Sequence, residues 1–184
     1  VYATHGLGPV AQALDIHRGD RMKTLVAMDT KSVAGKALVE ERTGAGCDNF
    51  RNGDHTTTLI RTENGKVIEI QHNVMTPQPY NRLYQLTGTK GFANKYPVEG
   101  EMAKEVGGHG GMDFIMDSRL VYCLQNGLPL DMDVYDLAEW CCLAELGELS
   151  MDNGCASVAF PDFTRGEWNK IKGYKHAYAT PEEE

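Results

Sequence analysis

This chain of 184 residues lacks the features that mark several large classes of protein. It has no apolar run near the roughly 20 residues of a membrane-spanning helix, so we expect no membrane span. Its Lys and Arg residues are scattered singly and its net charge is -8. A nucleic-acid-binding surface needs a basic stripe that neutralises phosphates, so we expect no nucleic acid as a partner. No signal pattern opens the chain, and a start at Val1 rather than Met looks like a cut inside a longer protein.

Cysteine chemistry is also sparse. The chain has five cysteines, an odd number at irregular spacing, which does not make a disulfide framework. No two of them form a CxxC pair, so we expect no structural zinc site and assign no metal. We interpret them as buried or half-buried free thiols. They are Cys47, Cys123, Cys141, Cys142 and Cys155.

Several catalytic signatures are missing too. The pair Gly6-x-Gly8 follows no strand and lacks the third glycine of a dinucleotide fingerprint, and the glycine-rich stretch 107–111 lacks the Lys-Ser/Thr ending of a P-loop. Nothing supports a nucleophile elbow. The carboxylates of Asp131, Asp133 and Asp136 precede or open an expected helix, where the helix macrodipole explains acidic residues, so we assign no catalytic carboxylate pair.

The expected elements run strands first and helices afterwards. Alternating and β-branched residues predict strands, with Asn64-Gly65 as the turn of a hairpin, and glycine stops predict helix ends at Gly44 and Gly127. The expected strands are 22–28, 55–62, 66–74 and 80–87, with a fourth meander strand near 92–94, and the expected helices are 6–16, 32–43, 112–126 and 134–150. This order predicts an α+β fold: an open mixed, largely antiparallel sheet with helices packed on one face.

We expect residues 1–180 to form one domain and residues 181–184 a disordered tail. A sheet covered by helices on one side only leaves its other face to meet a second subunit, another domain or a ligand.

The strongest candidates for catalytic residues lie near the start of the chain. Tyr2, Thr4 and His5 precede two glycines and a proline, and an imidazole is the natural acid or base near neutral pH. The glycines suggest a backbone that a ligand approaches closely. The alternative is that His5 only caps a helix.

Two further loops carry candidate groups. His109 lies in a glycine-rich loop whose amides could accept an anion at a helix start, or it is a solvent-exposed residue of a connector. Prolines 77 and 79 stiffen a loop that delivers Tyr80 and Arg82 at a strand start, as substrate contacts or as ordinary surface residues. We interpret the isolated His17, His55, His72 and His176 as structural.

Five stretches in unchanged order resemble the C-terminal part of glycoside hydrolase family 109, the NAD-dependent α-N-acetylgalactosaminidases of the Gfo/Idh/MocA oxidoreductase-like superfamily. They are YATHGLGPV at 2–10, GTKGFANKYP at 88–97, GHGGMDF at 108–114, NGLPLDMDVYD at 126–136 and PDFTRG at 161–166. The superfamily's usual pattern has an acidic residue three positions after the His, where this chain has Gly8. That departure favours the glycosidase branch over ordinary sugar dehydrogenases.

The resemblance implies the superfamily's C-terminal domain, with the NAD-binding Rossmann domain outside this chain. It implies hydrolysis of α-N-acetylgalactosaminides by transient oxidation at C3, elimination, water addition and re-reduction. The family's catalytic His and Tyr would fall on His5 and Tyr2, and Tyr80, Arg82 and His109 are substrate-contact candidates.

Its implied partners are a carbohydrate, its own Rossmann domain and further copies of itself through the open sheet face. A periplasmic or secreted location is implied, with the cytoplasm as alternative. A sugar dehydrogenase of the same superfamily and a non-catalytic oligomerisation or sugar-binding module remain alternatives, and we expect the isolated chain to be inactive and not to hold NAD tightly.

Overall fold

A computed structural model describes residues 3–79, 81, 83–95 and 109–171. Contacts between residues divide the chain into two compact units. Unit 1 comprises residues 1–80 and 138–173, and unit 2 comprises residues 81–137 and 174–184. The expected tail at 181–184 lies outside the described residues.

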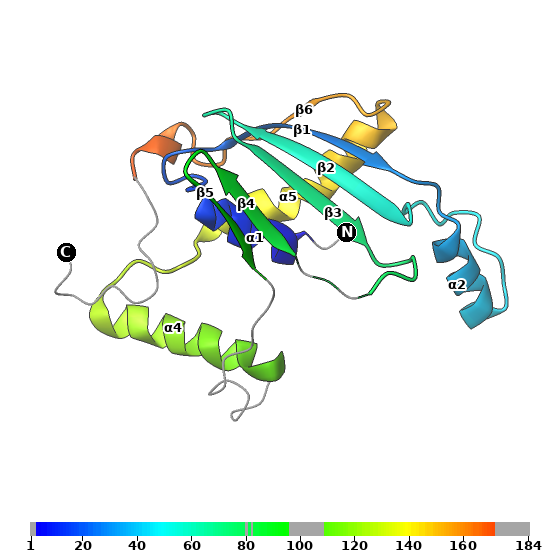
Figure 1. Ribbon diagram of the computed structural model, residues 1–184, viewed down its shortest axis with the longest axis horizontal. Coiled ribbons are helices and arrows are strands. Elements are labelled where there is room, and N and C mark those ends of the chain that lie inside the picture. Colours follow the sequence, from blue (N-terminus) through cyan, green and yellow to red (C-terminus); the bar gives the residue numbers. More distant parts are fainter. Residues whose placement is uncertain (1–2, 80, 82, 96–108, 172–184) are drawn as a thin grey trace. The chain divides into compact units, whose positions relative to one another are not determined.

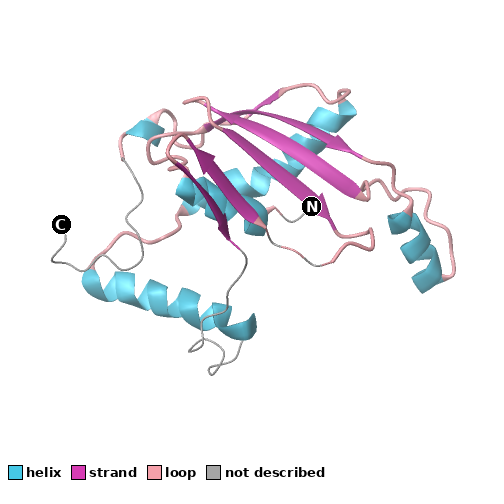
Figure 2. Cartoon of the chain, viewed as in Figure 1, coloured by secondary structure: helices cyan, strands magenta, loops and turns pink. Residues whose placement is uncertain are grey.

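Unit 1 contains an open four-stranded sheet in the order β3-β2-β1-β6 (Figures 1 and 2). The strands are β1 (Met22–Asp29), β2 (His55–Thr62), β3 (Val67–Asn73) and β6 (Val158–Ala159). All three strand pairs are antiparallel, with Val26 opposite Leu59 and Leu59 opposite Glu69. The predicted α+β class with an open, antiparallel sheet is confirmed.

The β2–β3 hairpin closes at the predicted Asn-Gly turn. Gly65 has φ +82°, in the left-handed region that glycine adopts without a Cβ penalty. The backbone N–H of Thr62 donates to the carbonyl of Lys66 across the turn at 2.9 Å. The buried carboxylate of Asp20 accepts a further bond from the backbone N–H of Asn64 at 3.0 Å, so a loop before β1 also supports this turn.

Two helices cover one face of this sheet, α1 (Thr4–Ala13) and α5 (Val134–Asp152), as Figure 1 shows. Strand residues alternate between faces, so the buried ones define the helix-covered side. Burial of these apolar side chains supplies the main stabilising free energy of the unit. The buried cluster is Leu7, Ala11, Ile16, Met22, Leu25, Ala27, Ile60, Ile68, Trp140, Leu143 and Phe160.

The opposite face of the sheet carries the intervening residues. Met28 and Val67 are 61% and 66% exposed, Leu59 is also exposed, and Val26 is half-buried. Val26 and Leu59 lie opposite each other, and the polar Thr57, Arg61 and Glu69 lie among these apolar residues on the same face.

The edge of β1 is completed by a side chain. β6 pairs only with Thr24 and Leu25, so it ends before Ala27. The hydroxyl of Ser150 on α5 accepts the backbone N–H of Ala27 at 3.0 Å and donates to the carbonyl of Ala156 at 2.7 Å. This fully buried serine therefore replaces a missing strand partner.

The third helix of unit 1, α2 (Ala34–Thr43), ends at Gly44 with φ +69°, as its glycine stop predicts. Its first turn is held by a residue that follows it by about 20 positions. The Asp54 carboxylate accepts bonds from the backbone N–H groups of Val33, Ala34 and Gly35 at 2.8–2.9 Å. These bonds outweigh desolvation and lower the pKa of Asp54 from its usual range.

Unit 2 contains the hairpin β4 (Tyr84–Gly88) and β5 (Gly91–Lys95), the short 3-10 turn η1 (His109–Gly111) and the helix α4 (Met112–Asn126). The expected third and fourth meander strands form a sheet of their own and do not extend the four-stranded sheet. Strand patterns report local conformation and not which neighbour a strand joins, so the sequence could not reveal this.

α4 ends at Gly127 with φ +64°, as predicted, and the last described element is the 3-10 turn η2 (Glu167–Asn169). Across the described ranges, no helix combines the length and the apolar character that crossing a bilayer requires.

Candidate functional site

His5 is the second residue of α1, and Ala3 is the residue that caps the helix. His5 is therefore not the cap that the alternative interpretation expected. The buried residues of α1 are Leu7, Gly8 and Ala11, whereas His5 is exposed. Because helical residues turn by 100° per position, the imidazole lies on the side of α1 opposite the sheet.

The glycines after His5 are helical rather than part of a loop. Gly8 is buried, and a Cβ built on it would lie 3.2 Å from two ring carbons of Trp140 on α5. The close neighbour of this glycine is thus an indole of the same chain, where the sequence suggested a ligand. A Cβ on Gly6 would meet only Ile70 Cγ2, at an ordinary 3.5 Å.

Pro9 lies inside α1 and has no N–H to donate to the carbonyl of His5, as a residue four positions on would normally do. Beside His5, the hydroxyl Oγ1 of Thr4 is buried and has no hydrogen-bond partner among the described residues. Buried polar atoms are usually paired, so this part of the YATH motif has spare hydrogen-bonding capacity. Tyr2, the predicted partner of His5, lies outside the described residues, as do Tyr80 and Arg82.

His109 is exposed in η1, and its Nδ1 lies 3.0 Å from Asp113 Oδ2 in the first turn of α4. A carboxylate on Nδ1 fixes the tautomer and orientation of an imidazole, although an exposed pair of this kind adds little stability. The residue is therefore an oriented surface histidine. The structure places His5 in unit 1 and His109 in unit 2.

One buried histidine–glutamate contact follows α1, and the sequence indicated only a structural role for its histidine. His17 Nδ1 lies 3.1 Å from Glu139 Oε2, and both side chains are almost fully buried. His17 has φ +48°, a conformation uncommon for residues other than glycine. The pair joins the loop after α1 to α5, which agrees with a structural role. No spacing in the sequence links residues so far apart.

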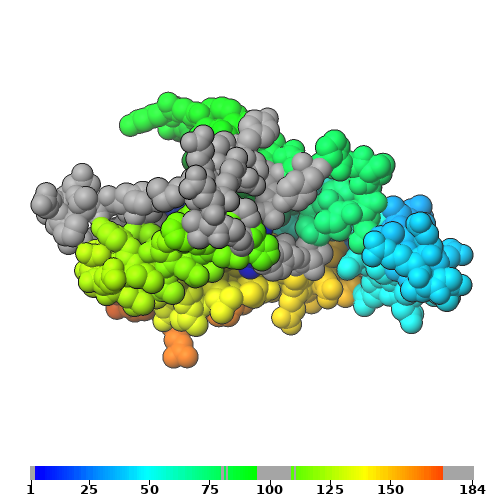
Figure 3. Space-filling view, turned by 90° about the horizontal axis from the view of Figure 1, so that it is seen from below, coloured from blue at the N-terminus to red at the C-terminus, as the bar shows by residue number. Residues whose placement is uncertain are grey.

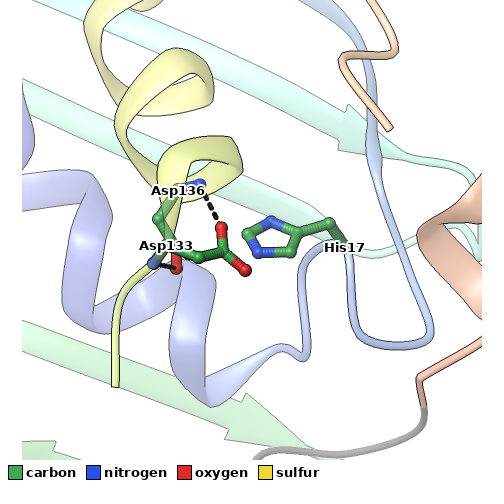
Figure 4. Close-up of side chains that lie close together, drawn as sticks. All are labelled: His17, Asp133 and Asp136. Atoms are coloured by element: carbon green, nitrogen blue, oxygen red, sulfur yellow. Dashed lines mark hydrogen bonds between the residues drawn. The ribbon is translucent and has the colours of Figure 1, made fainter. Parts of the chain in front are cut away.

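Asp131, Asp133 and Asp136, the acidic residues before and at the start of α5, each have a structural partner. Asp133 Oδ1 accepts the backbone N–H of Asp136 at 3.1 Å, and Asp136 Oδ2 accepts that of Asp133 at 2.9 Å, which is a reciprocal capping box. Figure 4 shows this pair, and also His17 on its loop. Asp131 forms a two-bond ion pair with Arg119 at 2.8 and 3.1 Å. Helix capping therefore accounts for the Asp133–Asp136 pair.

Hydrogen bonds between its own residues also stabilise the PDFTRG motif at 161–166. Asp162 accepts bonds from the hydroxyl of Thr164 at 2.6 Å and from the backbone N–H of Gly166 at 2.8 Å. Burial raises the pKa of Asp162, but these bonds outweigh it and lower the pKa overall. The motif thus specifies a turn in unit 1.

Comparison with known proteins identifies relatives of this chain. Residues 1–101 and 98–170 match the family described as "Glycosyl hydrolase 109, C-terminal domain". Glycosyl hydrolase family 109 protein 5 of Phocaeicola vulgatus is 71% identical over 231 residues, covering 100% of this chain and 44% of that protein. The family 109 proteins of Porphyromonas gingivalis and Bacteroides thetaiotaomicron (protein 1) are each 56% identical over 97% of this chain and 48% of their own length.

The α+β fold and the match over nearly the whole chain define a C-terminal domain of the glycosyl hydrolase class. The chain belongs to glycosyl hydrolase family 109. It spans a little under half the length of these relatives.

Proposed function

We propose that this chain is the substrate-facing part of an NAD-dependent glycosidase that hydrolyses α-N-acetylgalactosaminides, and that His5 moves a sugar hydroxyl proton. The observation that carries the proposal is the position of His5. It is exposed in the first turn of α1, and the opposite side of this helix is buried in the hydrophobic core.

Such a position suits acid–base chemistry. A general base must be held within hydrogen-bond reach of the proton that it takes, and small displacements cost much of the rate. Leu7 and Ala11 anchor α1 by burial, and Gly8 lets the helix approach Trp140 closely. The backbone that carries His5 is therefore rigid while the imidazole itself faces outward.

We include NAD in the proposal because the family that this chain resembles uses NAD as its cofactor. Bound NAD supplies reversible removal of the hydride at C3 of the sugar, so no net oxidation results. The described residues contain no glycine-rich strand–turn–helix unit, and we assign no residue of this chain to NAD. In this scheme His5 takes the proton of the hydroxyl that is oxidised and returns it later, and Tyr2 acts at C2 or binds the sugar.

The remaining candidates are substrate contacts. His109, oriented by Asp113, offers one ring nitrogen to a hydroxyl or carbonyl oxygen. Tyr80 and Arg82 offer a phenol and a guanidinium, which suit a sugar ring and its polar groups. None of these contacts requires the paired carboxylates of ordinary glycosidases.

The test uses a protein that includes the residues the longer relatives carry. It should release the aryl group from an aryl α-N-acetylgalactosaminide with NAD in catalytic amount and without lasting absorbance of NADH. NADH that accumulates in proportion to sugar consumed would show a dehydrogenase instead. Binding of the sugar without either product would show a non-catalytic module.

A further inference from the structure

His72 lies on the helix-covered face of the sheet in unit 1. The side chains of a strand alternate between its two faces. On β3, Ile68 is buried in the core and Ile70 packs against it, so His72, two positions further on, lies on the same face. The sequence indicated only a structural role for this histidine, because no spacing in the chain relates it to His5.

Two contacts define how α1 runs along β3. At the end of α1, the carbonyl of Leu14 accepts a hydrogen bond from Nζ of Lys66, the residue before β3, at 2.7 Å. In the first turn of α1, a Cβ on Gly6 would lie 3.5 Å from Ile70 Cγ2. The two helix residues are about 12 Å apart along a helix axis, and the two strand residues are about 13 Å apart along a strand. The helix and the strand therefore run side by side in opposite directions (Figure 1).

This alignment brings His72 to the start of α1. Beyond the contact of Gly6 with Ile70, His72 lies about 7 Å further along the strand, and Thr4 about 3 Å further along the helix. The imidazole of His72 is therefore beside the end of the helix at which Thr4 and His5 lie. Figure 3 shows residues around the end of β3, in blue-green, at the molecular surface.

The helix-covered face of the sheet changes from apolar to polar towards this end. In the middle of the sheet, the residues that lie opposite one another on the three long strands are apolar and buried. They are Leu25, Ile60 and Ile68. In the last row the residues are polar, and each is exposed or half-buried. They are Asp29, Thr56 and His72. The polar end of this face is therefore open to a polar ligand, whereas the middle belongs to the core.

The ring of His72 has the hydrogen-bonding capacity that such a ligand needs. Among the described residues, no hydrogen bond joins either ring nitrogen to a neighbour. Burial, together with nearby positive charge that includes His55, lowers the pKa of His72 below its usual range, so the ring is neutral at neutral pH. A neutral imidazole donates from one nitrogen and accepts at the other, which suits a sugar hydroxyl.

We infer that His72 is a substrate-binding residue of the same site as His5, and that its imidazole accepts a hydrogen bond from a hydroxyl of the sugar. A sugar bound at the start of α1 would meet His5 on the outer side of the helix and His72 on the sheet side. The identity of the sugar rests on the proposed function, whereas the position of His72 beside α1 does not.

The experiment uses the longer protein with the variants His72→Phe and His72→Gln. Calorimetry gives the Kd for N-acetylgalactosamine, and hydrolysis of the aryl substrate gives KM and kcat. Phenylalanine keeps a flat ring but has no nitrogens, so Kd and KM should rise about 3- to 10-fold, the usual effect of one lost neutral hydrogen bond. The fall in kcat should be smaller than that in His5→Ala. Glutamine offers a donor and an acceptor again and should recover most of the affinity.

His55→Phe is the matched control, because His55 lies on the neighbouring strand and on the opposite face of the sheet. It should leave Kd and KM unchanged. If His72→Phe melts much earlier than the unmodified protein, His72→Val takes its place, since valine suits a strand. Unchanged Kd and KM in a stable His72 variant, or equal losses from His55→Phe, would overturn the inference.

These outcomes differ from a failure of the proposed function. A protein that binds the sugar without cleaving it would contradict the proposed function, while weaker binding by His72→Phe would still support the role of His72. Hydrolysis that is unaffected in the His72 variants would support the proposed function and contradict the inference. A longer protein that binds no N-acetylgalactosamine would overturn both.

Discussion

Gly8 on α1 lies against the indole of Trp140 on α5, and the site of a Cβ on Gly8 is 3.2 Å from two carbons of that ring. The contact fixes the distance between the helix that carries His5 and the helix that backs it. A side chain at position 8 would have to displace that ring.

Gly8→Ala should therefore push Trp140 away and lower the free energy of unfolding by about 1–3 kcal/mol, the usual cost of overpacking a core. Urea denaturation and the fluorescence of Trp140 measure the two effects. Gly6→Ala is the matched control on the same helix. Its Cβ meets only Ile70, at an ordinary 3.5 Å, and alanine favours the helix, so stability should hold or rise. Equal losses from both variants would show that the indole contact is not what requires Gly8.

Asp54 should make the stability of α2 depend on acid pH. The pKa of its carboxyl is lowered in the folded chain because backbone N–H groups of Ala34, Gly35 and Val33 bind the charged form, against desolvation. A lowered folded pKa contributes stability that is present above the unfolded value, near 3.8, and lost as pH falls through the folded value.

Hydrogen exchange of the α2 amides should become faster as the pH falls through this range, because α2 loses stability. The variant Asp54→Asn should show the faster exchange already at neutral pH. Asp48→Asn, an exposed change between α2 and β2, is the control and should leave α2 protected. Exchange in α2 that is independent of pH and of Asp54 would contradict the role of this cap.

His5→Ala, made in the longer protein, should lower kcat by about 10² to 10⁴, the usual contribution of a positioned general base. The melting temperature should change little because the side chain is exposed and Ala3 caps the helix. His55→Ala, which removes a bond to Thr57 on β2, is the comparison and should keep near-normal turnover. A His5→Ala enzyme that is active but melts earlier would mean that His5 is structural.

The isolated chain should fold without holding NAD tightly, since no dinucleotide fingerprint occurs in it. Calorimetric titration with NAD should give no binding below a Kd of about 1 µM, equivalent to roughly -8 kcal/mol. Tight binding to this chain alone would show that part of the cofactor site lies here.

The open sheet face should drive self-association. Met28, Leu59 and Val67 expose apolar surface on the side that α1 and α5 leave uncovered. Sedimentation equilibrium should show concentration-dependent association that Leu59→Lys weakens, while Thr57→Lys, a polar residue on the same face, weakens it less. A strict monomer over a wide concentration range would contradict this prediction.

The sequence by itself determined the features that depend on a few neighbouring residues. The Asn64-Gly65 hairpin turn and the stops at Gly44 and Gly127 follow from the backbone freedom of glycine, and alternating side chains specified β2 and β3. The capping of α5 by Asp133 likewise needs only a residue three positions away. Such features can be predicted because their partners are adjacent in the chain.

Only the tertiary structure decided which distant groups meet. Trp140 occupies the space beside Gly8, Asp54 caps a helix that ends before it, and Ser150 completes the edge of β1. Likewise, β4 and β5 pair with each other and leave the edge of β3 alone among the described strands. Each of these pairings is selected by packing over the whole unit, where burial and hydrogen bonding are satisfied together, and no local pattern encodes that choice.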